Sequence, residues 1–477
     1  MGLFDFLKRR WQRKLYVRRF TAAEHSRWTD WVLSYNKIDR DLRNDYIGMT
    51  LRIRELAKNS EFVAGFLENA ERNVIGAEGF ALQSKNQTHG KIIENLWKEY
   101  NSRLAGAVTF DERSSGHDFD CLVLRTLLID GEVFIHREWD PESRFGWRYE
   151  VIDSLEVDPY YNVEDAGNGD RIVMGVRIDE RGREKSFFIR RSESDVYMSG
   201  ERTEVPASRI IHIYRKIFPD QHRGISMFAP VVSNLAQLDG YKDAELVHAR
   251  IQACTMGVWE WNGQSSGDML DEVDEQGEFI REIKPGIFPV APRGYSAKFL
   301  QNTSPNSQFA SFWKNILRSV ANALGFSYNK ASGDYEAVNY SSLREATLED
   351  RAAFSKIQRF IIENWKDFQF NDFITAIGLG GFIPLRTTAE CRDHRFFGRR
   401  FPWVDPAKEI AAKEKEFDLL MTDPISELES RGIDPDELLD RWEMWQKKLS
   451  DRKIPFMVRP PVAVIEQNEE EGNVNEP

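Results

Sequence analysis

The chain of 477 residues carries 65 basic and 77 acidic side chains, a formal net charge of −12, and 41% hydrophobic residues. This length suits two to four folding units, and the acidic balance excludes a protein that grips nucleic acid over its whole surface. No run of 18 apolar residues occurs, so no membrane span is predicted, and three widely spaced cysteines favour a reducing cytosol over a disulfide framework or metal cluster.

Residues 1–20 are basic, lack the apolar segment of a signal peptide and are expected to form a mobile arm. Residues 50–215 predict an α+β domain. Apolar residues three or four apart indicate helices near 50–72 and 119–130, with Gly76 and Gly131 as their stops. Short β-favouring runs then predict strands at 132–138, 149–152, 171–178, 185–189 and 209–214.

The longest helical pattern runs over 226–252. Its length of about 27 residues corresponds to about 40 Å, and its apolar residues recur along one face. Short strands are predicted at 258–261 and 297–300, followed by a helix over 306–324 that Gly325 ends. A helix, a small β insertion and a second helix predict an elongated arrangement.

A polar segment, 327–340, separates this second helix from a third one that begins at Ser341 or Ser342. Long irregular segments in compact proteins are commonly functional, and this one holds a single basic residue, Lys330, among polar and acidic neighbours. Further helices are predicted from Asp405 and over 437–448, and the acidic end of the chain is expected to be disordered.

The sequence contains no P-loop, no G-x-S-x-G, no H-E-x-x-H and no paired C-x-x-C motif. His212 is interpreted as a packed histidine with one bonded ring nitrogen rather than a catalytic base, and Arg223 as a structural residue rather than an anion ligand. An acidic run over 268–278 favours a solvated or partner-facing surface over a metal site, because EF-hand spacing is absent. We therefore predict no catalytic residue, no metal and no cofactor.

Several motifs occur in an order that resembles the lambda type of phage portal protein. The motifs are Arg54–Ser60, Asn73–Gly76, Asp130–Phe134, Val205–Ala207 with Ile210–Tyr214, Gln221–Ser226, Leu317–Gly325 with Asn339–Arg344, and Trp403–Pro406.

The resemblance implies an elongated α+β subunit of a ring, usually of twelve copies, at one capsid vertex. It also implies a division of the chain. The expected parts are a basic arm (1–20), a wing (21–225), a stem helix (226–254), a clip (255–305), a second stem helix (306–325), a tunnel loop (326–341), a tunnel helix and the rest of the wing (342–404), a crown (405–450) and a disordered tail (451–477).

The implied protein is not an enzyme but a channel for DNA packaging and ejection. Its expected partners are the terminase large subunit, a head-completion or adaptor protein, the major capsid and scaffolding proteins and double-stranded DNA, in the virion and, during assembly, in the host cytoplasm. The implied tunnel-loop residues are Tyr328, Asn329, Lys330, Asp334 and Glu336, and the implied clip residues for partner docking are Trp259, Trp261, Asp271, Glu272, Phe288 and Phe299. Two alternatives remain open: a hydrolase using scattered carboxylates and His212, and a tail or baseplate scaffold.

Overall fold

The computed structural model describes residues 36–105, 107–191, 200–254, 258–261, 295–298, 308–336, 338–401, 406–430 and 435–452. The chain divides into two compact units that are interleaved in sequence. The first takes in Met1–Ala64, Leu122–Glu138 and Tyr149–Leu324, and the second takes in Gly65–Cys121, Trp139–Arg148 and Gly325–Pro477. The stretch 50–215, predicted as one α+β domain, therefore contributes to both units.

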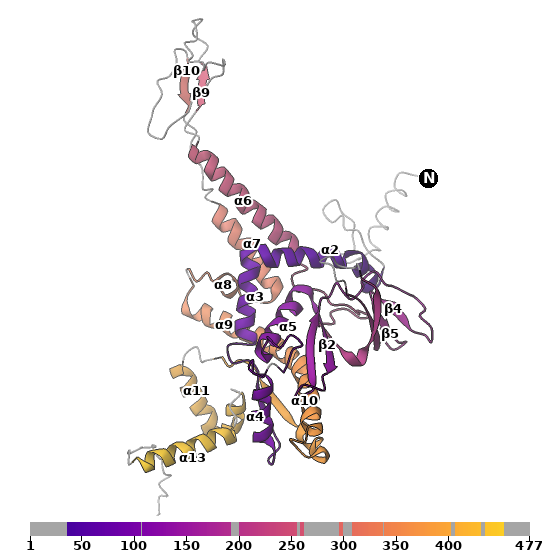
Figure 1. The fold of residues 1–477 in the computed structure, drawn as a ribbon. Coiled ribbons are helices and arrows are strands. Elements are labelled where there is room, and N and C mark those ends of the chain that lie inside the picture. The colour runs from indigo at the N-terminus through magenta and orange to yellow at the C-terminus, as the bar shows by residue number, and fades with distance from the viewer. Residues whose placement is uncertain are drawn as a thin grey trace, which may run out of the picture. The chain divides into compact units, whose positions relative to one another are not determined.

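Apart from a two-stranded hairpin described below, the first unit contains two sheets (Figure 1). The three-stranded sheet has the order β3 (Trp147–Ile152), β2 (Glu132–Trp139), β8 (Ile210–Tyr214), and the four-stranded sheet has the order β4 (Arg171–Val173), β5 (Val176–Ile178), β6 (Glu184–Arg190), β7 (Arg202–Pro206). The strand predicted over 171–178 is two strands, because Met174 and Gly175 take positive φ angles of 46° and 81° and turn the chain.

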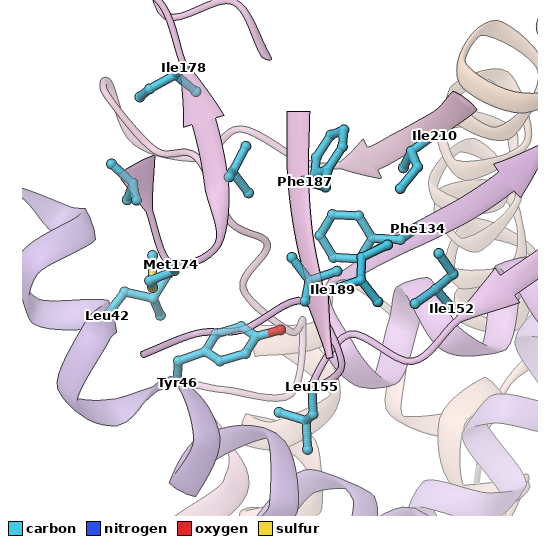
Figure 2. Packing of buried hydrophobic residues seen from close by; sticks show 13 residues of the cluster. Leu42, Tyr46, Phe134, Ile152, Leu155, Met174, Ile178, Phe187, Ile189 and Ile210 are labelled. Atoms are coloured by element: carbon cyan, nitrogen blue, oxygen red, sulfur yellow. The ribbon is translucent and has the colours of Figure 1, made fainter. Parts of the chain in front are cut away.

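The core of the first unit lies between these sheets and helix α2 (Ile38–Asn59). Figure 2 shows Leu42 and Tyr46 of α2 facing the same cluster as Phe134, Phe187 and the other buried side chains. The rings of Phe134 and Phe187 meet edge to face with centroids 5.6 Å apart, a favourable aromatic geometry. This packing fixes α2 against the strands.

The helix predicted over 50–72 is two helices, α2 and α3 (Glu61–Val74). Ser60 breaks it with an extended backbone. Helix α5 (Gly116–Asp130) ends at Gly131, whose φ of 87° gives the predicted stop.

Helices α6 (Val232–Cys254) and α7 (Phe309–Leu324) lie side by side, with Tyr241 of α6 against Phe309 at 5.3 Å between ring centroids (Figure 1). The long helix begins six residues later than predicted. Turns occupy 227–231 instead, because Pro230 has no N–H to donate. Strands β9 (Val258–Trp261) and β10 (Tyr295–Lys298) pair as an antiparallel hairpin.

The second unit joins helices to a small sheet of β1 (Ala81–Ser84) and β11 (His394–Phe397). Trp97 packs against Phe373 at 5.1 Å between centroids, at the centre of an aromatic core. Most of α3 and the start of α5 belong to this unit. Its other helices are α4 (Gly90–Tyr100), α8 (Tyr328–Ser332), α9 (Tyr340–Ile361), the π-helical turn η3 (Ile362–Lys366), α10 (Asp367–Leu379), α11 (Pro406–Asp418), α12 (Pro424–Ser430) and α13 (Pro435–Asp451). Short 3-10 turns lie at Leu385–Thr387 and Glu390–Arg392, and another, Ala207–Arg209, lies in the first unit.

In the described ranges, no helix is both long and apolar enough to cross a membrane.

Candidate functional site

The segment predicted as an irregular tunnel loop contains one short helix, α8. Ser327 caps it, since its side-chain oxygen accepts a hydrogen bond from the Lys330 backbone N–H, and Gly333 ends it with a φ of 71°. This helix was not predicted, because a single turn is too short to show a helical periodicity in the sequence.

Two neighbouring helices hold the first half of this segment. Asp350 of α9 accepts hydrogen bonds from the Ser327 backbone N–H at 2.7 Å and from its hydroxyl at 2.5 Å. The Asn69 amide of α3 donates to the Lys330 carbonyl at 2.9 Å. Neither Asp350 nor Asn69 was predicted, although a buried aspartate within an apolar helix face is a signal that a partner is required.

The structure brings two of the predicted tunnel-loop residues together. The Tyr328 hydroxyl donates to Asp334 at 3.0 Å, and the other Asp334 oxygen accepts from the Glu336 backbone N–H at 3.0 Å. Asn329 accepts a backbone hydrogen bond from Gly333 at 2.9 Å, whereas Glu336 is exposed. The segment is therefore organised from Ser327 to Glu336.

Lys330 is half-buried rather than freely extended. Burial lowers the pKa of its ammonium group, nearby Asp350 raises it, and Arg399 and Arg351 lower it further. Lys330 therefore lies near one carboxylate and several arginines from distant parts of the chain, which the composition of the loop does not show.

The predicted clip residues are described only in part. Trp259 and Trp261 belong to β9, where they pair in register with Ala297 and Tyr295 of β10. The remaining clip residues, Asp271, Glu272, Phe288 and Phe299, lie outside the described residues.

A buried polar network lies just before α6 in the first unit. Its centre is Arg223, a fully buried residue. The guanidinium group donates to Met174 O (2.6 Å), Val157 O (3.2 Å), Ser154 O (2.8 Å), Tyr46 Oη (2.8 Å) and Glu132 Oε1 (2.8 Å). The predicted structural role of Arg223 is confirmed.

His212 lies between two carboxylates of the same network. Its Nδ1 is 2.7 Å from Glu184 and its Nε2 is 3.2 Å from Glu132. Burial alone would lower its pKa, but the carboxylates outweigh burial and raise it to about 9. Burial would likewise raise the pKa of Glu132, but Arg223 and His212 lower it to about 2. The prediction of one bonded ring nitrogen was wrong, since both are engaged.

Three of the ordered motifs meet at this network. Arg54 binds Asp130 at 2.6 Å and Asp153 at 2.7 Å. The Gly224 backbone N–H donates to Glu132 at 2.6 Å. A Cβ on Gly131 would lie 2.2 Å from the Ile225 carbonyl carbon, so only glycine permits this crossing. The motifs therefore specify how the chain enters α6.

The polar groups of this network bind one another inside the fold and are not presented to solvent as reactive groups. His212 is fully enclosed and cannot meet a substrate. Among the residues that the structure describes, no three or more histidine, cysteine, aspartate or glutamate side chains lie together so that they could hold a metal ion. The buried Arg223–Glu132 ion pair therefore holds the first unit together, which is the role expected of such groups in a structural protein.

The chain belongs to the lambda family of phage portal proteins, whose model matches residues 24–358. It is 29% identical over 448 residues to the "Probable portal protein" of Halomonas phage phiHAP-1. The aligned region covers 89% of this chain and 85% of that protein. It is 20% identical over 374 residues to "Portal protein B" of Escherichia phage lambda, with 69% of each chain covered. The chain is thus a phage portal protein and a virion component.

A solved structure titled "Neck of empty GTA particle computed with C6 symmetry" also aligns with the chain. It covers 80% of this chain and 94% of that chain, at 11% identity and a TM-score of 0.44.

Proposed function

We propose that copies of this chain assemble into a ring, of twelve subunits, at one vertex of the capsid, and that the central channel conducts double-stranded DNA during packaging and ejection. The observation that carries this proposal is the family match over residues 24–358. It spans both sheets, the buried network around Arg223, the helix pair α6 and α7, and most of α9.

We assign the parts of the subunit by the same family resemblance. The paired helices α6 and α7 with the β9–β10 hairpin correspond in order to stem, clip and stem, and α11 to α13 fall within the crown. The assigned parts are the arm (1–20), wing (21–225), stem helix (226–254), clip (255–305), second stem helix (306–325), tunnel loop (326–341), tunnel helix and remaining wing (342–404), crown (405–450) and tail (451–477).

The tunnel loop is proposed to meet DNA through Tyr328, Asn329, Lys330, Asp334 and Glu336. Asp350 anchors the start of the loop, whereas Gly333, Tyr335 and Glu336 are exposed, as are Asn339, Tyr340 and Ser341 near its end. The net charge of −12 for each subunit disfavours persistent adhesion to a polyanion. A loop that is anchored at its start and exposed further along suits transient contacts with a moving DNA duplex.

The clip is proposed to dock the terminase large subunit during packaging and a head-completion or adaptor protein afterwards. The ring would also contact the major capsid and scaffolding proteins during assembly in the host cytoplasm. The chain itself is proposed to be non-catalytic, because the sequence carries no P-loop to hydrolyse ATP and His212 is enclosed by two glutamates. The energy for DNA movement would come from the terminase.

A packaging assay tests this function. Procapsids assembled with the chain should protect full-length DNA from nuclease when terminase and ATP are supplied. Procapsids assembled without it should protect none. Equal protection in both preparations would contradict a portal role.

A further inference from the structure

A polar cavity of about 360 Å³ opens beside the start of α2 in the first unit. Its walls come from the first residues of that helix, from strand β4 and from two loops. The charged side chains that line it are Lys37, Arg40, Arg43, Asp39, Glu164, Arg171 and Asp220.

The acidic residues of the wall are largely engaged. Asp220 pairs with Lys37 at 3.0 Å, and Asp39 pairs with His222 at 2.7 Å. Lys37 lowers the pKa of the Asp220 carboxyl, and the charge of Arg171 lowers it further.

Three arginines of the wall have no such partner. Within the described ranges, the guanidinium groups of Arg40, Arg43 and Arg171 make no hydrogen bond or ion pair, and the Nε atom of Arg43 is buried without an acceptor. A buried donor without an acceptor is costly, so an absent acceptor is expected here.

The start of α2 carries charges of both signs. Lys37 is the N-cap and gives no side-chain cap, and Asp39, Arg40 and Asp41 lie in the first turn. Asp39 is engaged by His222, and Asp41 accepts a hydrogen bond from Asn36. An anion bound by the arginines at this end would also be favoured by the helix dipole.

The balance of charge selects the class of anion. Four cationic and three acidic side chains line the cavity, which leaves one net positive charge. A DNA backbone carries one negative charge per about 1.7 Å and would be repelled by Glu164 and Asp220. A single carboxylate suits the cavity better, since an arginine fork binds it through two parallel hydrogen bonds.

The chain carries such carboxylates at its own C-terminus. Residues 460–477 contain five glutamates, Glu466, Glu469, Glu470, Glu471 and Glu476, and no lysine or arginine. We propose that the acidic tail of one copy of this chain docks a glutamate carboxylate in the arginine-lined cavity of a second copy. This inference goes beyond the channel function and does not depend on it.

A binding experiment with a labelled peptide of residues 460–477 tests the proposal. The receptor is the full-length chain with its five tail glutamates changed to glutamine, so that its own tail does not compete. Fluorescence anisotropy should show saturable binding of the native peptide. A peptide with glutamine at the same five positions should bind about tenfold more weakly or not at all.

Substitutions in the receptor locate the site. Arg40→Ala with Arg171→Ala should weaken peptide binding about tenfold, whereas Arg52→Ala, an exposed arginine of the same helix, should leave it unchanged. Arg43→Lys keeps the charge but loses the fork, and it should weaken binding less than the double substitution while preserving the fold.

Three outcomes would overturn the proposal. The first is equal binding of the native and glutamine peptides. The second is a loss of peptide affinity in Arg52→Ala as large as that in the double substitution. The third is a short DNA duplex that binds through Arg40 and Arg171 in preference to the peptide. The last result would assign the cavity to nucleic acid. Ring formation, measured separately by particle mass, reports on the channel function alone.

Discussion

Arg223 and Glu132 form an ion pair of 2.7 Å in which neither side chain is exposed to solvent. The pair connects the loop before α6 to the first residue of β2. Glu132 also binds the Tyr46 hydroxyl of α2 at 2.5 Å. One carboxylate therefore joins helix α2, strand β2 and the loop that enters α6.

Removing one partner of this pair should destabilise the first unit strongly. Arg223→Leu leaves the Glu132 charge buried without its main counter-ion, and such losses cost about 3–5 kcal/mol. The free energy of unfolding from urea denaturation measures the change. Arg52→Ala, an exposed arginine of α2, should change it by no more than about 0.5 kcal/mol. A loss below about 1 kcal/mol for Arg223→Leu would mean that the network contributes little.

The stability of the chain should depend on pH through His212. Its pKa is raised from 6.5 to about 9 on folding, so its contribution is complete below pH 6.5 and is lost as the pH rises through 9. We expect the free energy of unfolding to fall between pH 6.5 and 9. The slope should flatten in His212→Gln and persist in His248→Gln, an exposed histidine of α6. An unchanged slope in His212→Gln would show that another group titrates.

Glu132 predicts the opposite behaviour in acid. Its pKa is lowered from 4.5 to about 2, so its contribution is present above pH 4.5 and is lost as the pH falls through 2. Urea denaturation of the wild type and Glu132→Gln should therefore show the largest difference in stability above pH 4.5. A difference that does not shrink towards pH 2 would contradict this assignment.

The tryptophans of β9 are predicted to act between subunits and partners. Trp259→Ala should reduce ring assembly or terminase docking while the first unit keeps its far-ultraviolet circular dichroism and its melting temperature. Glu260→Ala, at the next position of the same strand, serves as the matched control. If Trp259→Ala assembles rings and packages DNA as the wild type does, the docking role is wrong.

Lys330 tests the tunnel loop more sharply than a deletion, because removing 329–336 would also remove most of α8. Lys330→Gln should leave rings intact and reduce DNA retention by up to about fivefold, since one screened ion pair contributes about 1 kcal/mol or less. Lys356→Gln, an exposed lysine of α9, is the control. Retention equal to the wild type would make the segment a connector, and a failure to form rings would place it at the subunit interface.

Local signals in the sequence predicted much of the fold. Gly131 and Gly325 end their helices with positive φ, as their positions indicated, and Gly182 takes a positive φ in the hairpin between β5 and β6. The start of α6 was displaced because apolar spacing continues through residues whose backbone forms turns instead.

Features made by distant contacts were not predictable from a single sequence. The turn η3 places Trp365 and Lys366 next to Asp120, with the Lys366 ammonium 3.0 Å from that carboxylate. Burial lowers the pKa of Lys366, and Asp120 raises it. Helical periodicity does not reveal such a turn, because the sequence around it keeps an ordinary helical composition.

The mass and symmetry of the purified particle test the central claim most directly. Electron cryo-microscopy, with mass photometry of the same sample, should show closed rings with a central channel and a mass near twelve times the 55.5 kDa of one chain. A particle that remains a monomer or dimer, or that forms open filaments under assembly conditions, would contradict the portal account.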